Sequence, residues 1–329
     1  MTVEHGGWYP VTDAGSVGVV RRAAAHLAAE LELTEARLGE LAIVSAELAG
    51  NLYKYAIDGV VHLRRLRCGE DRGVELVAID AGPGMADLAV SVADGHSTSG
   101  TLGIGLGAIR RQATRVDAYS RPGRGTVLAA SVWSAPPPAS WAEGLVRPIA
   151  GETASGDGYA VRSDPDHRQV MLCDGLGHGP LAALAAQRAT VEFGAAPPGG
   201  PRLVLEHLHR ALARTRGAVA AVVDLAGDTL RFAGLGNISA WVTDGTTRRA
   251  MTSLPGIVGH QRPEIREFEY RLPPGAVVVL HTDGLTDRWE LTPYPGLLDR
   301  QPVLVAATLM RDAGRRRDDA GVLVAKAPR

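Results

Sequence analysis

The chain has 329 residues, of which 45% are hydrophobic and 22% charged, and a net charge of −1. A single core rarely serves a chain of this length, so two domains are expected. The near-neutral charge favours neither nucleic acid nor a membrane surface as partner, and no stretch approaches the roughly 18 apolar residues of a membrane span. Cys68 and Cys173 lack CxxC spacing, which excludes a cysteine-based zinc site and predicts a cytoplasmic protein.

The first part of the chain predicts two helices followed by strands. Helices are expected over residues 13–30 and 34–56, the second with Thr34 as its N-cap. Strand-like segments follow at residues 61–67, 74–80, 115–121 and 126–133. This order predicts an α/β sandwich.

The second helix carries a polar stripe beside its core face. Helical spacing places on the core face Leu38, Leu41, Ser45, Leu48 and Leu52. Glu47, Asn51 and Lys54 remain on the flank, where a carboxylate can accept a proton, a carboxamide can bind Mg²⁺ and an ammonium can reach a phosphate. By itself the stripe also fits a solvated helix face.

Two glycine-containing segments follow. Asp80 ends a strand in DAGPGM, where Gly82 and Gly84 permit a tight turn and the carboxylate can accept a bond from an amino group such as that of adenine. Residues 95–111, GHSTSGTLGIGLGAIRR, place glycines before a helix, where backbone N–H groups can hold phosphates. The spacing is not that of a Walker A loop, and the order of elements is not that of a dinucleotide fold.

The ordered segments ELAGN, DAGPG, GTLGIGLG and Gly125–Thr126 resemble the GHKL ATPase superfamily, in its anti-sigma-factor serine/threonine kinase branch. The resemblance implies a GHKL (Bergerat) α/β sandwich over residues 1–133 that binds ATP with Mg²⁺. It implies Glu47 as general base, Asn51 as Mg²⁺ ligand, Asp80 as adenine partner and residues 100–107 as a lid. The residues expected to bind the nucleotide, with Lys54 added from its chemistry alone, are Asn51, Lys54, Asp80, Gly82, Gly84, Ser99, Gly100, Thr101, Gly103, Gly105, Leu106 and Thr126.

The proline-rich segment SAPPPAS, residues 134–140, marks the domain boundary, because three prolines disfavour helix and central strand. We expect a linker over residues 134–143 and a second domain over residues 144–329. Only two helices are expected there, at residues 181–193 and 203–214. Strands are expected at residues 159–162, 169–173, 218–225, 230–233, 240–243, 277–281 and 321–325.

The second half also places acidic residues beside predicted strand ends and turns. They are Asp157, Asp174, Asp283, Asp318 and Asp319. Metal-assisted phosphoester hydrolysis needs carboxylates that converge from separate strand ends, because hard cations prefer oxygen ligands. Taken singly, each aspartate is more typical of a turn or a helix cap.

In order, and together with the DGLGHG and AGLGN segments, these residues resemble the SpoIIE-type branch of the PPM metal-dependent protein phosphatases. The resemblance implies an α-β-β-α sandwich. It implies that two Mn²⁺ or Mg²⁺ ions are held by Asp157, Asp174, the Gly175 carbonyl, Asp283 and Asp318, with Asp157, Asp174 and Asp283 as the catalytic set. Gly321 departs from the pattern, because the family has a threonine there. His178 and the basic run Arg315–Arg317 fit capping and surface roles.

The combined resemblance implies a bifunctional regulator of a sigma-factor partner-switching pathway. The first domain would phosphorylate Ser or Thr on a STAS-domain anti-sigma-factor antagonist or a stressosome-like protein, and the second would dephosphorylate such a protein. An anti-sigma or sigma factor is a further expected partner. Two alternatives stay open: the first domain only senses ATP or binds a partner, or both domains serve as a scaffold.

Overall fold

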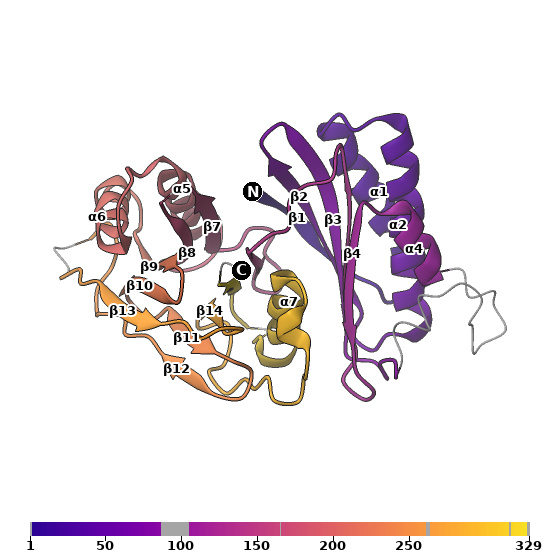
Figure 1. Cartoon of the computed structure of the whole chain (residues 1–329). Helices are drawn as coiled ribbons and strands as arrows, with labels where there is room; N and C mark the ends of the chain where they lie inside the picture. The colour runs from indigo at the N-terminus through magenta and orange to yellow at the C-terminus, as the bar shows by residue number, and fades with distance from the viewer. Residues whose placement is uncertain (1, 87–104, 165, 261–263, 316, 328–329) are drawn as a thin grey trace. The chain divides into compact units, whose positions relative to one another are not determined.

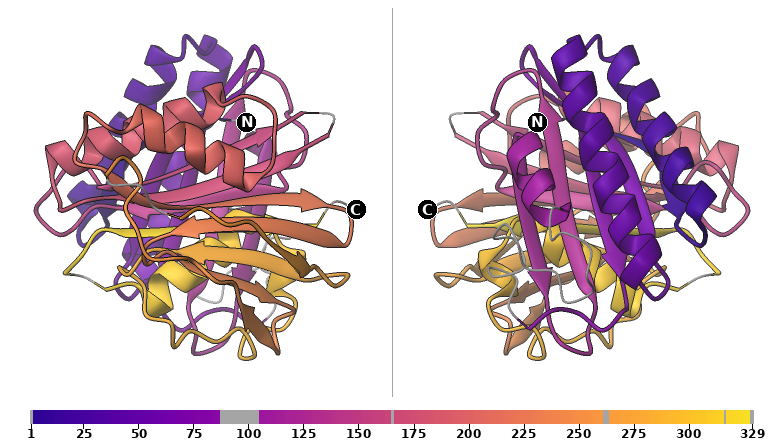
Figure 2. Two further views of the ribbon diagram at one scale, coloured as in Figure 1. Left: turned by 90° about the vertical axis from the view of Figure 1, so that its left-hand side faces the viewer. Right: turned by 90° about the vertical axis from the view of Figure 1, so that its right-hand side faces the viewer.

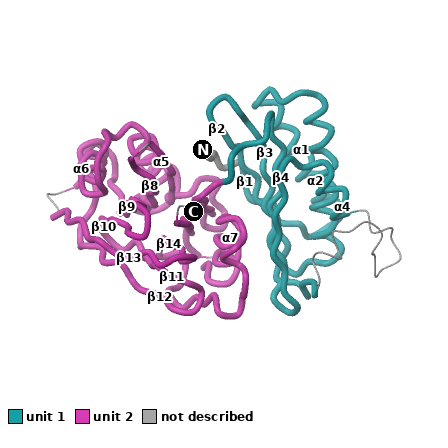
Figure 3. Tube along the Cα trace, in the orientation of Figure 1, with its two compact units in different colours: residues 1–139 teal, residues 140–329 magenta. Residues whose placement is uncertain are grey.

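The computed structural model describes residues 2–86, 105–164, 166–260, 264–315 and 317–327. The chain divides into two compact units, Met1–Ala139 and Ser140–Arg329 (Figure 3). Within the described ranges, no helix is both long enough and apolar enough to cross a bilayer.

The first unit contains a five-stranded antiparallel sheet in the order β1-β2-β3-β5-β4 (Figure 1). Its strands are β1 (Thr2–Pro10), β2 (Val60–Cys68), β3 (Asp71–Asp80), β4 (Arg115–Ser120) and β5 (Thr126–Trp133). Its helices are α1 (Ala14–Glu30), α2 (Glu35–Tyr55) and α4 (Gly105–Gln112). The helices cover one face of the sheet (Figure 2).

The first two helices begin where the sequence predicts. Asp13 caps α1 by accepting a 2.8 Å bond from the backbone of Ser16, and Thr34 caps α2 by accepting one from Arg37. The apolar face of α2 packs into the core that the helices share with the sheet, with Leu41, Leu48 and Leu52 buried. This packing fixes the rotation of α2, so its polar stripe faces away from the core.

The second unit contains two five-stranded sheets, in the orders β13-β10-β9-β8-β7 and β12-β11-β14-β15-β6. The strands of the first are β7 (Asp157–Ser163), β8 (Arg168–Gly175), β9 (Ala218–Ala226), β10 (Thr229–Leu235) and β13 (Phe268–Arg271). Those of the second are β6 (Ala142–Arg147), β11 (Ser239–Thr243), β12 (Arg248–Ala250), β14 (Val277–His281) and β15 (Ala320–Lys326).

Helices cover the outer faces of both sheets. The first sheet carries α5 (Pro180–Ala195) and α6 (Pro201–Ala211), which share a buried core with β8 and β9. The second carries α7 (Pro302–Ala313), packed on β6 and β15, and a short 3-10 turn, η1 (Leu297–Asp299), lies before it. The predicted α-β-β-α sandwich is therefore confirmed, as is the two-domain α/β class.

Several elements differ from the sequence-based expectation. The prediction of only two helices in the second unit is wrong, because α7 is a third. The strands β1, β6, β12 and β13 were not expected, and β6 begins at Ala142, inside the stretch expected to be linker. The helix expected to reach Arg214 ends at Ala211.

Candidate functional site

The first candidate site lies where α2 meets the start of α4. Glu47 and Asn51 are one turn apart on α2, and both are half-buried. A Cβ atom on Gly105 would lie 3.2 Å from both Glu47 Oε2 and Asn51 Oδ1. The carboxylate and the carboxamide therefore converge on the first residue of α4, and glycine leaves open the space between them.

Asp80 forms the other end of this site. It ends β3, is 9% exposed, and its carboxylate accepts a 2.7 Å bond from the Gly82 backbone. Its partner in the register is Thr126, the first residue of β5. The Thr126 hydroxyl lies 2.9 Å from the hydroxyl of Ser120, which also accepts a bond from the Met85 backbone. Ser120 ends β4 as the register partner of Thr126, and no motif in the sequence marks it.

Glycine is required at two positions in this corner. Gly84 has φ +66° and Gly125 has φ +73°. A side chain at Gly125 would collide with the Asp80 carbonyl group, and one at Gly84 with that of Arg121. The turns after β3 and before β5 can therefore close tightly enough to bring Asp80 beside Thr126.

The remaining nucleotide-site predictions have different outcomes. Gly105 and Leu106 are the first two residues of α4, so they lie in the helix and not in a loop before it, and their contact with a nucleotide stays a prediction. Lys54 is exposed near the end of α2, and its role stays a prediction. Four of the residues expected to bind the nucleotide lie outside the described residues: Ser99, Gly100, Thr101 and Gly103.

The second candidate site starts at the paired ends of β7 and β8, where Asp157 and Asp174 are register partners. Asp157 is 5% exposed and Asp174 is half-buried. A Cβ atom on Gly175 would collide with the Ala182 carbonyl group, so glycine lets the start of α5 pack against the end of β8.

Thr282 connects the second sheet to Asp157. Its hydroxyl donates a 2.8 Å bond to Asp157 Oδ2 and accepts a 2.8 Å bond from the Gly321 backbone. Thr282 itself is 1% exposed. A Cβ atom on Gly321 would lie 3.0 Å from Asp157 Oδ2. The glycine that replaces the expected threonine therefore leaves room for the Asp157 carboxylate, which obtains its hydroxyl donor from Thr282.

The adjacent acids Asp318 and Asp319 differ in environment. Asp319 is 5% exposed and accepts bonds of 2.7 Å from the backbones of Ile149 and Gly156. It holds the loop that precedes Asp157. Asp318 is exposed, and its carboxylate accepts a 3.0 Å bond from the backbone of Asp319. Of the pair, Asp318 is the one available to a ligand.

Asp283 follows Thr282 and is held by Asn237, whose Nδ2 donates a 3.0 Å bond to Asp283 Oδ2. Asn237 ends the AGLGN segment that the sequence analysis noted as a motif without a role. Thr282 was missed, Asp319 was named among the acidic candidates without a role of its own, and Asn237 was noted only as part of a motif. In the sequence, Thr282 stands next to Asp283, Asp319 stands next to Asp318, and Asn237 ends the AGLGN motif.

The pKa shifts show that these carboxylates act on one another. Burial, followed by the charge of Asp174, raises the pKa of Asp157 well above its ordinary value, although the Thr282 bond lowers it. Burial, followed by the charge of Asp283, raises the pKa of Asp174 to about 7. The same two causes raise the pKa of Asp318. The charges acting on Asp157 and Asp174 come from other carboxylates, so the cluster is short of positive charge.

Hard divalent cations fit this donor set, because carboxylate oxygens are their preferred ligands and their charge would relieve the repulsion. In the described part of the chain, no group of three or more His, Cys, Asp or Glu side chains is arranged so that it could hold a metal ion. The carboxylates therefore supply negative charge and oxygen ligands, but these side chains alone do not complete the coordination of a metal ion.

Comparisons with known proteins find a family for each half of the chain. Residues 164–328 match the family model "Stage II sporulation protein E (SpoIIE)", and residues 10–132 match "Histidine kinase-like ATPase domain". The serine/threonine-protein kinase RsbT of Bacillus subtilis (strain 168) is 32% identical over 113 residues, which cover 34% of this chain and 85% of RsbT.

Among solved structures, a chain described under "The bacterial stressosome: a modular system that has been adapted to control secondary messenger signaling" is 26% identical with a TM-score of 0.52. The match covers 56% of this chain and 98% of that one. RsbX in complex with magnesium is 17% identical with a TM-score of 0.46, over 56% of this chain and 94% of RsbX.

The two halves of the chain thus match two families in the order that their motifs predict, a kinase-like ATPase domain first and a PPM-type phosphatase domain second. The chain belongs to the SpoIIE family of PPM-type phosphatases, with an N-terminal histidine kinase-like ATPase domain of the RsbT type.

Proposed function

We propose that the chain is a bifunctional switch, in which the second domain removes phosphate from phosphoserine or phosphothreonine of a protein and the first domain adds it. The observation that carries the phosphatase half is the set of mutually repelling carboxylates, drawn from both sheets of the sandwich. The kinase half rests on the convergence of Glu47 and Asn51 at Gly105, together with the likeness to RsbT.

In the phosphatase domain, Asp157, Asp174, the Gly175 carbonyl, Asp283 and Asp318 would hold two Mn²⁺ or Mg²⁺ ions. When bound, such ions supply charge neutralisation and a water of lowered pKa. The chain's own residues keep the ligands in place: Thr282 fixes Asp157, Asn237 fixes Asp283, and Asp319 fixes the loop before Asp157. The oxygen of a water molecule then bonds to phosphorus as the bond between phosphorus and the seryl oxygen breaks. The seryl oxygen takes up the proton that the water loses.

In the kinase domain, Asn51 would hold Mg²⁺ beside the ATP phosphates, and Asp80 would accept a hydrogen bond from the adenine amino group. Glu47 accepts the proton of the substrate hydroxyl. At the same time the hydroxyl oxygen bonds to the γ-phosphorus of ATP, and the bond between that phosphorus and ADP breaks. The proposed substrate is a STAS-type partner or a stressosome-like protein, because the N-terminal relative is RsbT and a structural relative comes from a stressosome study.

The phosphatase proposal is tested with Asp174→Asn. The rate of manganese-dependent phosphopeptide hydrolysis should fall at least about 100-fold in this variant, because a neutral amide replaces a charged ligand in the cluster. Asp228→Asn is the matched control, since Asp228 is exposed at the turn between β9 and β10. Hydrolysis of equal rate in the two variants would remove Asp174 from the site.

The kinase proposal is tested with labelled ATP and a STAS-type partner. Glu47→Gln should reduce phosphoryl transfer by about 100-fold, in the range for a lost general base, while nucleotide binding is retained. Glu40→Gln is the control, because Glu40 lies on the same helix and pairs with Arg37. Nucleotide binding without transfer by the unaltered protein, over a panel of such partners, would instead establish the sensor alternative.

A further inference from the structure

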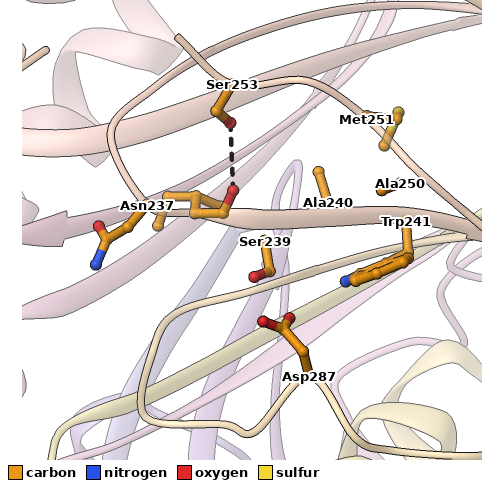
Figure 4. A pocket seen from close by; sticks show the side chains of 9 residues that line it. Asn237, Ser239, Ala240, Trp241, Ala250, Met251, Ser253 and Asp287 are labelled. Carbon is orange, nitrogen blue, oxygen red and sulfur yellow. Dashed lines mark hydrogen bonds between the residues drawn. The ribbon is translucent and has the colours of Figure 1, made fainter. Parts of the chain in front are cut away.

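A pocket of about 240 Å³ opens beside the candidate phosphatase site (Figure 4). Asn237 lies at its edge and donates its bond to Asp283, so the pocket and the acidic cluster share a residue. Ser239 is the first residue of β11 and follows Asn237 by two residues; it also lines the pocket and is the register partner of His281. A substrate peptide whose phosphoryl group lies at Asp283 can therefore place in the pocket a residue one or two positions away from the phosphorylated one.

Asn237 and Ser253 also line the pocket, but they donate to Asp283 and to the Ile238 carbonyl. The groups left for an occupant are the Asp287 carboxylate, the Ser239 hydroxyl and the Trp241 indole N–H. Figure 4 shows Ser239, Trp241 and Asp287 facing the same space. Within the described chain, the buried Trp241 Nε1 has no hydrogen-bond partner. Because a buried donor without an acceptor is costly, a ligand that brings a carbonyl oxygen gains from this position. A peptide backbone provides such an oxygen.

Trp241 is held rigidly in the pocket wall. The Arg248 guanidinium stacks 4.6 Å from the Trp241 ring and 5.0 Å from the Trp289 ring. Arg248 Nη1 donates to the backbone carbonyls of Asp287 and Trp289, at 2.6 and 3.0 Å. This cation is therefore engaged by rings and main chain, and no ion pair joins it to the Asp287 carboxylate in the described residues.

Asp287 is the only formally charged side chain among those that line the pocket. Its side chain is 60% exposed, and its Oδ1 lies 3.2 Å from His281 Nε2. That nitrogen already accepts a bond from Trp289, so it has no proton to donate to the Asp287 carboxylate. Ala240 and Met251 supply an apolar wall on which an aliphatic stem can lie.

We propose that this pocket binds a residue flanking the phosphorylated residue of the substrate protein, and that it prefers lysine or arginine to glutamate there. The inference rests on the proposed phosphatase function. The aliphatic stem of the basic side chain lies on the apolar wall, its charged end meets Asp287, and the substrate backbone accepts the Trp241 N–H. Glutamate at the same position is repelled by Asp287 and Asp283.

The test uses the full chain with Mn²⁺ and phosphoserine peptides in which Lys or Glu is placed singly at positions −2, −1, +1 and +2. At one position at least, the Lys peptide should have a kcat/KM about fivefold above that of the Glu peptide, as an exposed ion pair allows. Ala250→Lys, which adds a charge at the exposed rim, and Asp287→Asn should each bring this ratio near one.

Ala226→Lys provides the matched control, because Ala226 is also an exposed strand residue but ends β9 away from Asp174. It should keep the ratio of the unaltered protein. Equal rates for all the peptides, or a Lys preference that survives both pocket variants, would overturn the pocket assignment alone. If the unaltered protein hydrolyses neither the peptides nor p-nitrophenyl phosphate, the phosphatase proposal fails, and the pocket assignment fails with it.

Discussion

At the scale of single residues, the hydroxyl of Thr282 joins two strands of the phosphatase sandwich. It donates to the Asp157 carboxylate and also accepts a bond from the backbone of Gly321. Both of its partners are buried. Loss of the hydroxyl would therefore leave a carboxylate oxygen and an N–H group without a partner.

Thr282→Val should lower the free energy of unfolding by about 1 to 3 kcal/mol, the usual cost of buried unsatisfied groups. It should also weaken Mn²⁺ binding, measured by calorimetry, because Asp157 loses the bond that fixes its orientation and lowers its pKa. Thr282→Ser keeps the hydroxyl and should retain most of the Mn²⁺ affinity. Equal affinities in the Val and Ser variants would exclude the positioning role.

The sequence alone does not distinguish the roles of adjacent residues of the same type. The doublet of Asp318 and Asp319 predicts acidity at the last strand, but only burial separates the exposed member from the one that binds backbone. Asn237 stands 46 residues before Asp283, and only the sheet register brings the two together. Glu47, Asn51 and Asp80 could be predicted, because helical spacing and a strand end place them locally.

At the scale of elements, amphipathic segments with clear caps could be predicted and uniformly apolar ones could not. The helix α2 has a polar N-cap and one apolar face, and its bounds agree with the expectation within a residue. The helix α7 is buried nearly all round, from Pro302 to Met310, so it shows no helical period. The segment β6 follows directly after the prolines, and its six residues pair only with the distant β15. Long-range pairing of this kind leaves no local signal.

At the scale of the whole molecule, the acidic cluster links stability to pH. In the metal-free protein, the pKa values of Asp157 and Asp174 lie above those of the unfolded chain, so the folded state binds protons more tightly. The stability from this source is present below pH 4 and is lost as the pH rises through about 7, the pKa of Asp174.

The metal-free protein should therefore unfold more easily at pH 8 than at pH 5, by about 2 kcal/mol in urea titrations. Saturating Mn²⁺ should remove most of this difference, since the ions replace the protons as partners of the carboxylates. Without metal, Asp174→Asn should reduce the dependence of the free energy of unfolding on pH, whereas Asp228→Asn should leave this dependence unchanged. A metal-free slope of the opposite sign would contradict the description of the cluster.

The division of the acidic cluster between two sheets has a consequence for how the protein matures. Asp157 and Asp174 belong to one sheet, whereas Asp283 and Asp318 flank strands of the other, and Asp318 comes 161 residues after Asp157. A ribosome must therefore have translated nearly all of the second unit before the two halves of the cluster can meet. Under the proposed phosphatase function, an incompletely synthesised second unit would lack a complete cluster, and hydrolysis would begin only when the sandwich has closed.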